Sequence, residues 1–147
     1  MEKEGKTMKR TICMLLSLII LAALPVSVFA ARVPDGAELQ YVNATYPSLI
    51  FSINTSGNAT IKLSCTGKDN VTKITAKTYI EKNVNGNWVK VNVGTTDNIL
   101  TYTVNSSTLF KTYSKALTGS GSYRCTTTYT LYASTAETIK LVKYASY

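Results

Sequence analysis

The chain has 147 residues, of which 45% are hydrophobic, and it carries 16 Lys and Arg against 8 Asp and Glu, for a formal net charge of +8. This length suits one small domain with its own core. There is no histidine, which excludes Ser-His and Cys-His nucleophile pairs and removes a common zinc ligand. The positive charge is modest and spread out, so it does not predict a nucleic-acid-binding protein.

The first 30 residues predict a removable export signal. A basic pair at residues 9–10 precedes an apolar run over residues 12–24, and Val28 and Ala30 are small residues placed for a cut after Ala30. This order is typical of a secretory signal. The run is shorter than the roughly 20 residues of a membrane span. We therefore expect a secreted, extracellular product with no membrane span after cleavage.

Beyond the signal, residues 31–38 are polar and contain Pro and Gly, which predicts a flexible leader, and the domain is expected over residues 39–147. In the domain, apolar residues recur with period two, as in half-buried strands, and no stretch has a helical period. Residues 108–117 are ambiguous. The predicted strands are residues 48–54, 59–66, the two runs that flank residues 85–86, and residues 98–105, 123–133 and 137–144.

Asn85-Gly86 is a strong two-residue hairpin turn between two alternating runs. The turn fixes a pairing in which partner numbers sum to 171. Ile80 is then opposite Val91, and Thr78 is opposite Val93. These four side chains are expected on one face, directed toward the core.

The opposite face of this hairpin is the predicted binding surface. Lys77 and Tyr79 on its first strand and Trp88 and Lys90 on its second are expected to point outward together. Glu81 opposite Lys90 is a favourable cross-strand charge pair. Aromatic rings beside lysine can stack on sugar rings or approach a polyanion. An ordinary solvated sheet face is the alternative interpretation of the same residues.

Cys65 and Cys125 are the two cysteines that lie beyond the signal. In an exported protein an isolated pair predicts a disulfide. It would close a loop of about 60 residues, which stabilises a fold by up to roughly 4 kcal/mol on the chain-entropy model. Two unpaired buried thiols are the alternative.

Cys65 on an early strand and the run Gly121-Ser122-Tyr123-Arg124-Cys125 on a late one resemble the immunoglobulin fold. In that fold a tyrosine two residues before the second cysteine forms the tyrosine corner. The resemblance implies an all-β, antiparallel Ig-like β-sandwich of about seven strands with one inter-sheet disulfide. Trp88 departs from the pattern, because the hairpin register points it outward instead of onto the disulfide. The overall pattern is also similar to small, uncharacterised secreted proteins of Gram-positive bacteria.

No catalytic constellation is present: the carboxylates are scattered, and no spacing suggests a metal site. We therefore expect a non-enzymatic protein without cofactor or metal. The leading hypothesis is a secreted binding or cell-surface interaction module whose partner is a wall polysaccharide, another polyanion or another surface protein. One alternative is a small basic antimicrobial or toxin-like protein. Another is an extracellular matrix subunit that associates with itself.

Overall fold

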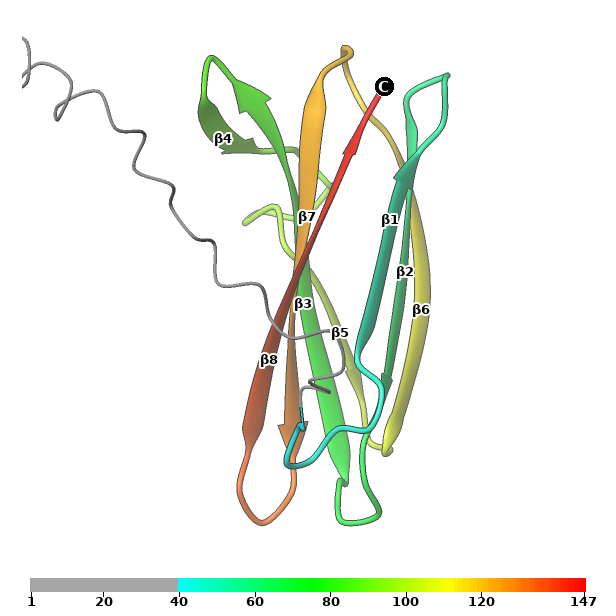
Figure 1. Ribbon diagram of the computed structural model, residues 1–147, viewed down its shortest axis with the longest axis vertical. Helices are drawn as coiled ribbons and strands as arrows, with labels where there is room; N and C mark the ends of the chain where they lie inside the picture. Colours follow the sequence, from blue (N-terminus) through cyan, green and yellow to red (C-terminus); the bar gives the residue numbers. More distant parts are fainter. Residues whose placement is uncertain (1–39) are drawn as a thin grey trace, which may run out of the picture. The chain divides into compact units, whose positions relative to one another are not determined.

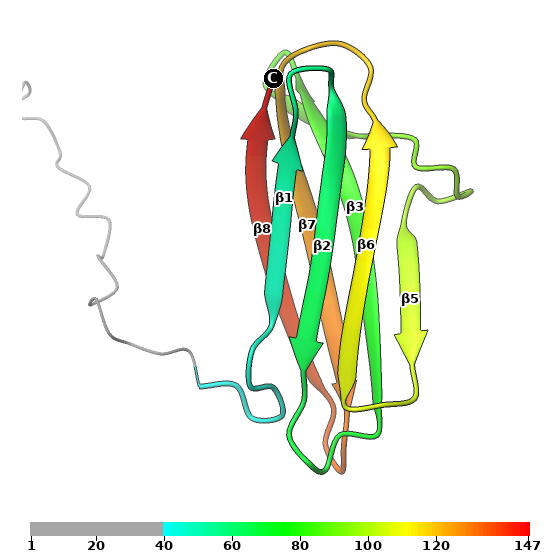
Figure 2. The same cartoon turned by 90° about the vertical axis from the view of Figure 1, so that its right-hand side faces the viewer.

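The computed structural model describes residues 40–147, so the predicted export signal, residues 1–30, and the predicted leader, residues 31–38, lie outside the described residues. In the described part, eight strands form two antiparallel sheets that pack face to face (Figures 1 and 2). The three-stranded sheet has the order β1 (Ser48–Ile53), β2 (Asn58–Thr66), β6 (Thr108–Ala116). The five-stranded sheet consists of β3 (Lys73–Val84), β4 (Asn87–Lys90), β5 (Leu100–Val104), β7 (Ser122–Tyr132) and β8 (Glu137–Ser146).

The five-stranded sheet has the order β4-β3-β7-β8, and β5 also pairs with β3. Both pairings fit on one edge because β3 is 12 residues long. Residues 81–84 of β3 pair with β4, and residues 74–78 pair with β5. Figure 2 shows β5 beside the lower half of β3. No helix in residues 40–147 is long and apolar enough to cross a membrane.

Alternation along β7 places one face in the core, as predicted. Tyr123, Cys125, Tyr129 and Leu131 are all at most 1% exposed. Thr127 belongs to the same face and is equally buried; its hydroxyl is 2.9 Å from that of Thr78 on β3. The one polar pair on this core face is therefore satisfied by a hydrogen bond within the described residues.

The β3–β4 hairpin has the predicted turn and register. Asn85 and Gly86 both have positive φ, 53° and 86°, as a two-residue turn that matches the strand twist requires. Glu81 pairs with Lys90. Local turn chemistry thus determines the pairs nearest the turn.

The hairpin pairing ends earlier than predicted. The Val91 N–H donates to the Ile80 carbonyl at 2.9 Å, and the chain then leaves β3. Thr78 pairs with Leu100 of β5 and not with Val93, so that part of the prediction is wrong. The turn specifies only its near neighbours, whereas Leu100 brings another buried apolar side chain to the same edge. Val93 is still buried, at 6% exposed.

Tyr123 makes the contact expected of a tyrosine corner. Its hydroxyl donates to the carbonyl oxygens of Thr118, at 3.0 Å, and Gly119, at 2.5 Å. Gly119 and Gly121 have φ of 73° and 140°, which side chains with a Cβ rarely adopt. The glycines therefore permit the turn, and the hydrogen bonds of the Tyr123 hydroxyl hold it against the start of β7.

The predicted disulfide does not form in this structure: Cys65 and Cys125 are free, fully buried thiols. The contacts of β7 indicate why. The Tyr129 hydroxyl donates to the Ser48 carbonyl, whose partner on β2 is Ser64, beside Cys65. The side chain of β7 that reaches the neighbourhood of Cys65 is thus that of Tyr129, four residues beyond Cys125. A disulfide needs Cα atoms within about 7 Å of each other.

Candidate functional site

The four residues predicted to form a binding face do share the outer face of the five-stranded sheet. Trp88 pairs with Asn83 and Lys90 with Glu81, which lie on the same face of β3 as Lys77 and Tyr79. Trp88 is partly buried there, and Lys77 and Lys90 are exposed. The sheet also brings β7 and β8 onto this face, because β3 pairs with β4 on one side and with β7 on the other.

Two residues that the sequence did not associate with Trp88 contact it. The Arg124 guanidinium carbon lies 4.6 Å from the centroid of the Trp88 ring, and the Tyr144 ring meets it edge to face at 5.9 Å. Arg124 and Tyr144 are register partners on β7 and β8. Alternation places Arg124 on the outer face, but only the strand order, in which β3 alone separates β7 from β4, brings it within reach of Trp88. One side of the indole is thus already occupied by a cation, an arrangement that is favourable in itself.

Glu81 is opposite Lys90, as predicted, but its carboxylate binds another cation. Arg124 Nε donates to Glu81 Oε2 at 2.5 Å, and this hydrogen bond is the main cause that raises the pKa of Arg124 above its ordinary value. Lys90 Nζ instead lies 5.2 Å from the centroid of the Tyr79 ring. The expected charge pair is replaced because Glu81 is only 8% exposed and Arg124 reaches it from a central strand, whereas Lys90 lies in solvent on the edge strand.

Cations dominate this outer face. Lys73 Nζ lies 3.8 Å from the centroid of the Tyr132 ring, so a third cation there is held by an aromatic ring. Among the described residues that alternation directs outward from the strands of this sheet, Glu81 is the only carboxylate, and it already binds Arg124. The cations on the face are Lys73, Lys77, Lys90, Arg124 and Lys140.

A shallow hollow of about 390 Å³, here called the Trp88 hollow, lies on this face at the hairpin end. The rings of Trp88 and Tyr144 contribute to its wall, and Tyr144 is 66% exposed. The Asn83 side-chain oxygen accepts the Gly86 N–H at 2.9 Å, which leaves its amide N–H groups for other partners. The remaining lining residues are Ser122, Tyr123, Ala145 and Ser146. Aromatic walls beside amide and hydroxyl groups suit a sugar ring.

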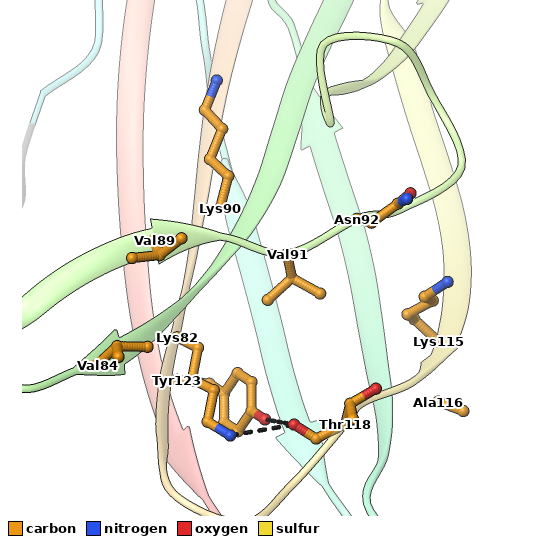
Figure 3. Close-up of a pocket in the computed structure, with 10 residues that line it drawn as sticks. All are labelled: Lys82, Val84, Val89, Lys90, Val91, Asn92, Lys115, Ala116, Thr118 and Tyr123. Carbon is orange, nitrogen blue, oxygen red and sulfur yellow. Dashed lines mark hydrogen bonds between the residues drawn. The ribbon is translucent and has the colours of Figure 1, made fainter.

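A second hollow, of about 440 Å³, lies against the inner face of the same hairpin (Figure 3). Val91 projects into its centre, while Lys82 and Tyr123 both reach the carbonyl of Thr118. The sequence did not predict this hollow, because one of its sides comes from the end of β6 and the turn that follows. Its lining residues are Lys82, Val84, Val89, Lys90, Val91, Asn92, Lys115, Ala116, Thr118 and Tyr123.

No group of three or more Cys, Asp or Glu side chains converges within residues 40–147. Glu137, for example, accepts the backbone N–H groups of Val42 and Asn43 at 2.9 and 2.6 Å.

The chain matches no family model and no curated protein.

Proposed function

We propose that this chain is a secreted, non-enzymatic binding module, and that its ligand is an extended anionic polysaccharide such as a wall polymer. The observation that carries the proposal is the charge of the outer face of the five-stranded sheet. Five cations lie there, and the single carboxylate among the described outward residues is already paired with one of them. Such a face attracts anions at long range and holds them at short range.

The spacing of the cations favours a polymer over a single small anion. Lys77 and Lys140 both pair with Thr128 from opposite sides, so their strands are about 10 Å apart at two strand spacings. Lys73 lies four residues before Lys77 on β3, about 13 Å along the strand at roughly 3.3 Å per residue. One small anion cannot contact all of these groups, whereas a chain of charged sugars can lie across them.

The Trp88 hollow supports a sugar as the repeating unit. Trp88 and Tyr144 supply apolar ring surface, and Ser122 and Ser146 supply hydroxyl groups in the same hollow. Sugar rings bind to this combination through their C–H faces and their hydroxyl groups. Arg124 lies against Trp88, so an acidic sugar in the hollow would also meet a cation.

We further propose that the scaffold is Ig-like. Strand order supports this classification, because β1-β2-β6 and β8-β7-β3 correspond to strands A, B and E of one sheet and G, F and C of the other in that fold. The hydrogen bonds from Tyr123 to Thr118 and Gly119 supply the tyrosine corner. The scaffold carries no functional implication of its own.

The test compares charge reversal on this face with charge reversal elsewhere. Lys77→Glu with Lys140→Glu changes the outer face. Lys62→Glu with Lys111→Glu is the matched control, because both lysines are exposed and lie on strands of the other sheet. Binding to immobilised polygalacturonate, with dextran as the neutral polymer, is measured for each variant.

The face variant should lose at least tenfold in affinity for polygalacturonate, and the control should stay within about threefold of the unaltered protein. Binding should also weaken as salt rises, since exposed charges are screened. An equal loss in both variants would mean attraction to net charge alone, and unchanged binding in the face variant would remove the site.

A further inference from the structure

The hollow of Figure 3 exists because β4 is short. After Val91 the chain leaves β3 and crosses to β6, where the Tyr113 hydroxyl donates to the Val93 carbonyl at 2.9 Å. Between Val91 and the turn, the inner face of the hairpin is therefore not covered by the opposite sheet. Val84 and Val89 on that face are accordingly 45% and 52% exposed. These two exposed valines lie side by side next to a concave space and so offer it an apolar surface.

Part of the wall of this pocket is apolar. Val84, Val89 and Val91 come from the hairpin, and the ring of Tyr123 lies across from them. The pocket measures about 440 Å³, which is within the range of roughly 300–1,000 Å³ found for small-molecule sites. An apolar body is therefore the part of a ligand that the wall would accept.

The charged groups of the pocket all have one sign, because Lys82, Lys90 and Lys115 line it and none of the other lining residues is acidic. Lys82 is held in place: its Nζ donates to the Thr118 carbonyl at 3.0 Å and the Gly119 carbonyl at 3.1 Å. An ammonium group has three N–H donors, so one remains for a ligand. Lys115 lies at the other end of the pocket beside Asn92, while Lys90 points away from the remaining lining residues (Figure 3).

We propose that this pocket binds an amphipathic anion, that is, a small molecule with an apolar body and one carboxylate, sulfonate or phosphate group. The apolar body lies on the three valines, and the anionic group meets Lys82 or Lys115 at the rim. Charge complementarity and the exposed valines together select this class, since a neutral apolar ligand would leave the lysines unused and a hydrophilic anion would leave the valines in water. The pocket is on the inner face of the hairpin, so its ligand does not depend on binding at the outer face.

Sodium octanoate is the probe, and its binding is followed on the full domain by ¹H–¹⁵N correlation spectra. A saturable titration should shift amide signals of residues 82–92 and 115–123. Val89→Asp and Lys115→Glu should each weaken binding at least tenfold. Lys111→Glu is the matched control, because Lys111 is exposed, four residues before Lys115 on β6, and outside the pocket; it should change the affinity by less than threefold.

Both lining positions tolerate polar replacement, because Val89 is 52% exposed and Lys115 is already charged, and dispersed amide signals in each variant confirm that it is folded. Signals that do not move, shifts confined to other regions, or equal losses in the Lys115 and Lys111 variants would each overturn the proposal. Vesicles with anionic headgroups form a separate arm. Binding to vesicles without binding to octanoate would assign the hairpin to a lipid surface and would likewise overturn a pocket for a soluble anion.

Discussion

The guanidinium group of Arg124 lies over the indole ring of Trp88, with 4.6 Å between the guanidinium carbon and the ring centroid. The same group is bonded to Glu81. The Arg124 side chain of β7 therefore contacts a residue of β3 and a residue of β4. The cation that contacts the only tryptophan in the chain is thus also one of the cations of the proposed binding face.

Replacing Arg124 with alanine should destabilise the domain, because it leaves the Glu81 carboxylate, 8% exposed, without its cation. Chemical denaturation measures the loss. The double variant Glu81→Gln with Arg124→Ala is the control, and it should recover part of the stability because no charge is left uncompensated. If the double variant is less stable than the unaltered protein by the sum of the losses measured for Glu81→Gln and Arg124→Ala alone, the ion pair is not the cause.

Replacing Tyr123 with phenylalanine should cost about 1–1.5 kcal/mol, since it removes only the hydroxyl that bonds to Thr118 and Gly119. The ring stays in place and keeps its contact with Tyr147, whose ring centroid is 5.9 Å away. Tyr132→Phe is a suitable comparison, because the Tyr132 ring contacts Lys73 and the Tyr132 hydroxyl makes no hydrogen bond within the described residues. Equal stability of the two variants, measured by thermal unfolding, would contradict a structural role for the corner.

The two buried thiols should make the domain less stable in alkaline solution. Burial raises the pKa of Cys65 to about 11 and that of Cys125 to about 12, from an ordinary value of 9.0. Below pH 9 both folded and unfolded chains keep the thiol protons, and the contribution does not change with pH. As pH rises above that value, the unfolded chain loses protons that the folded chain retains, so stability falls up to the folded pKa values.

This fall is measured as the difference in melting temperature between pH 8 and pH 10.5. The unaltered protein should lose more than Cys65→Ala with Cys125→Ala, in which the thiols are gone and the lysines and tyrosines remain. Maleimide labelling adds a second check: both thiols should be unreactive in the native protein and should react in guanidinium without a reductant. Thiols that stay unreactive after unfolding would mean that a disulfide has formed.

Much of the strand pattern was predictable because it is local. A period of two follows from strand geometry alone, and the strand predicted over residues 123–133 corresponds to β7 (Ser122–Tyr132). The ambiguous segment, residues 108–117, contains β6 (Thr108–Ala116). Its alternation of apolar and polar residues is weak because β6 is an edge strand. Lys111, for example, lies on the same face as the buried Leu109 but is exposed.

The errors concern relations between distant segments. The hairpin register, extended from the turn, predicted Val93 as the partner of Thr78, but the partner is Leu100 of β5. The cysteine count could not reveal that Cys65 and Cys125 stay unpaired, because the alignment of the two sheets depends on the packing of the whole core.

The candidate site was half predictable for the same reason. Turn chemistry placed Trp88 and Lys90 on the face of Tyr79. The addition of Arg124 and Tyr144 required the order of strands in the sheet, which no local pattern contains. The predicted binding face did not include Arg124, although it is the register partner of Glu81.

The most direct test of the proposed function is the fluorescence of Trp88 during titration with polygalacturonate. An acidic polymer on the outer face would compete for Arg124 and change the surroundings of the indole, so a saturable shift in emission is predicted, weakened at least tenfold in Lys77→Glu with Lys140→Glu. Emission that stays constant while the polymer binds, or that shifts equally in Lys62→Glu with Lys111→Glu and in the face variant, would contradict the outer face as the binding site.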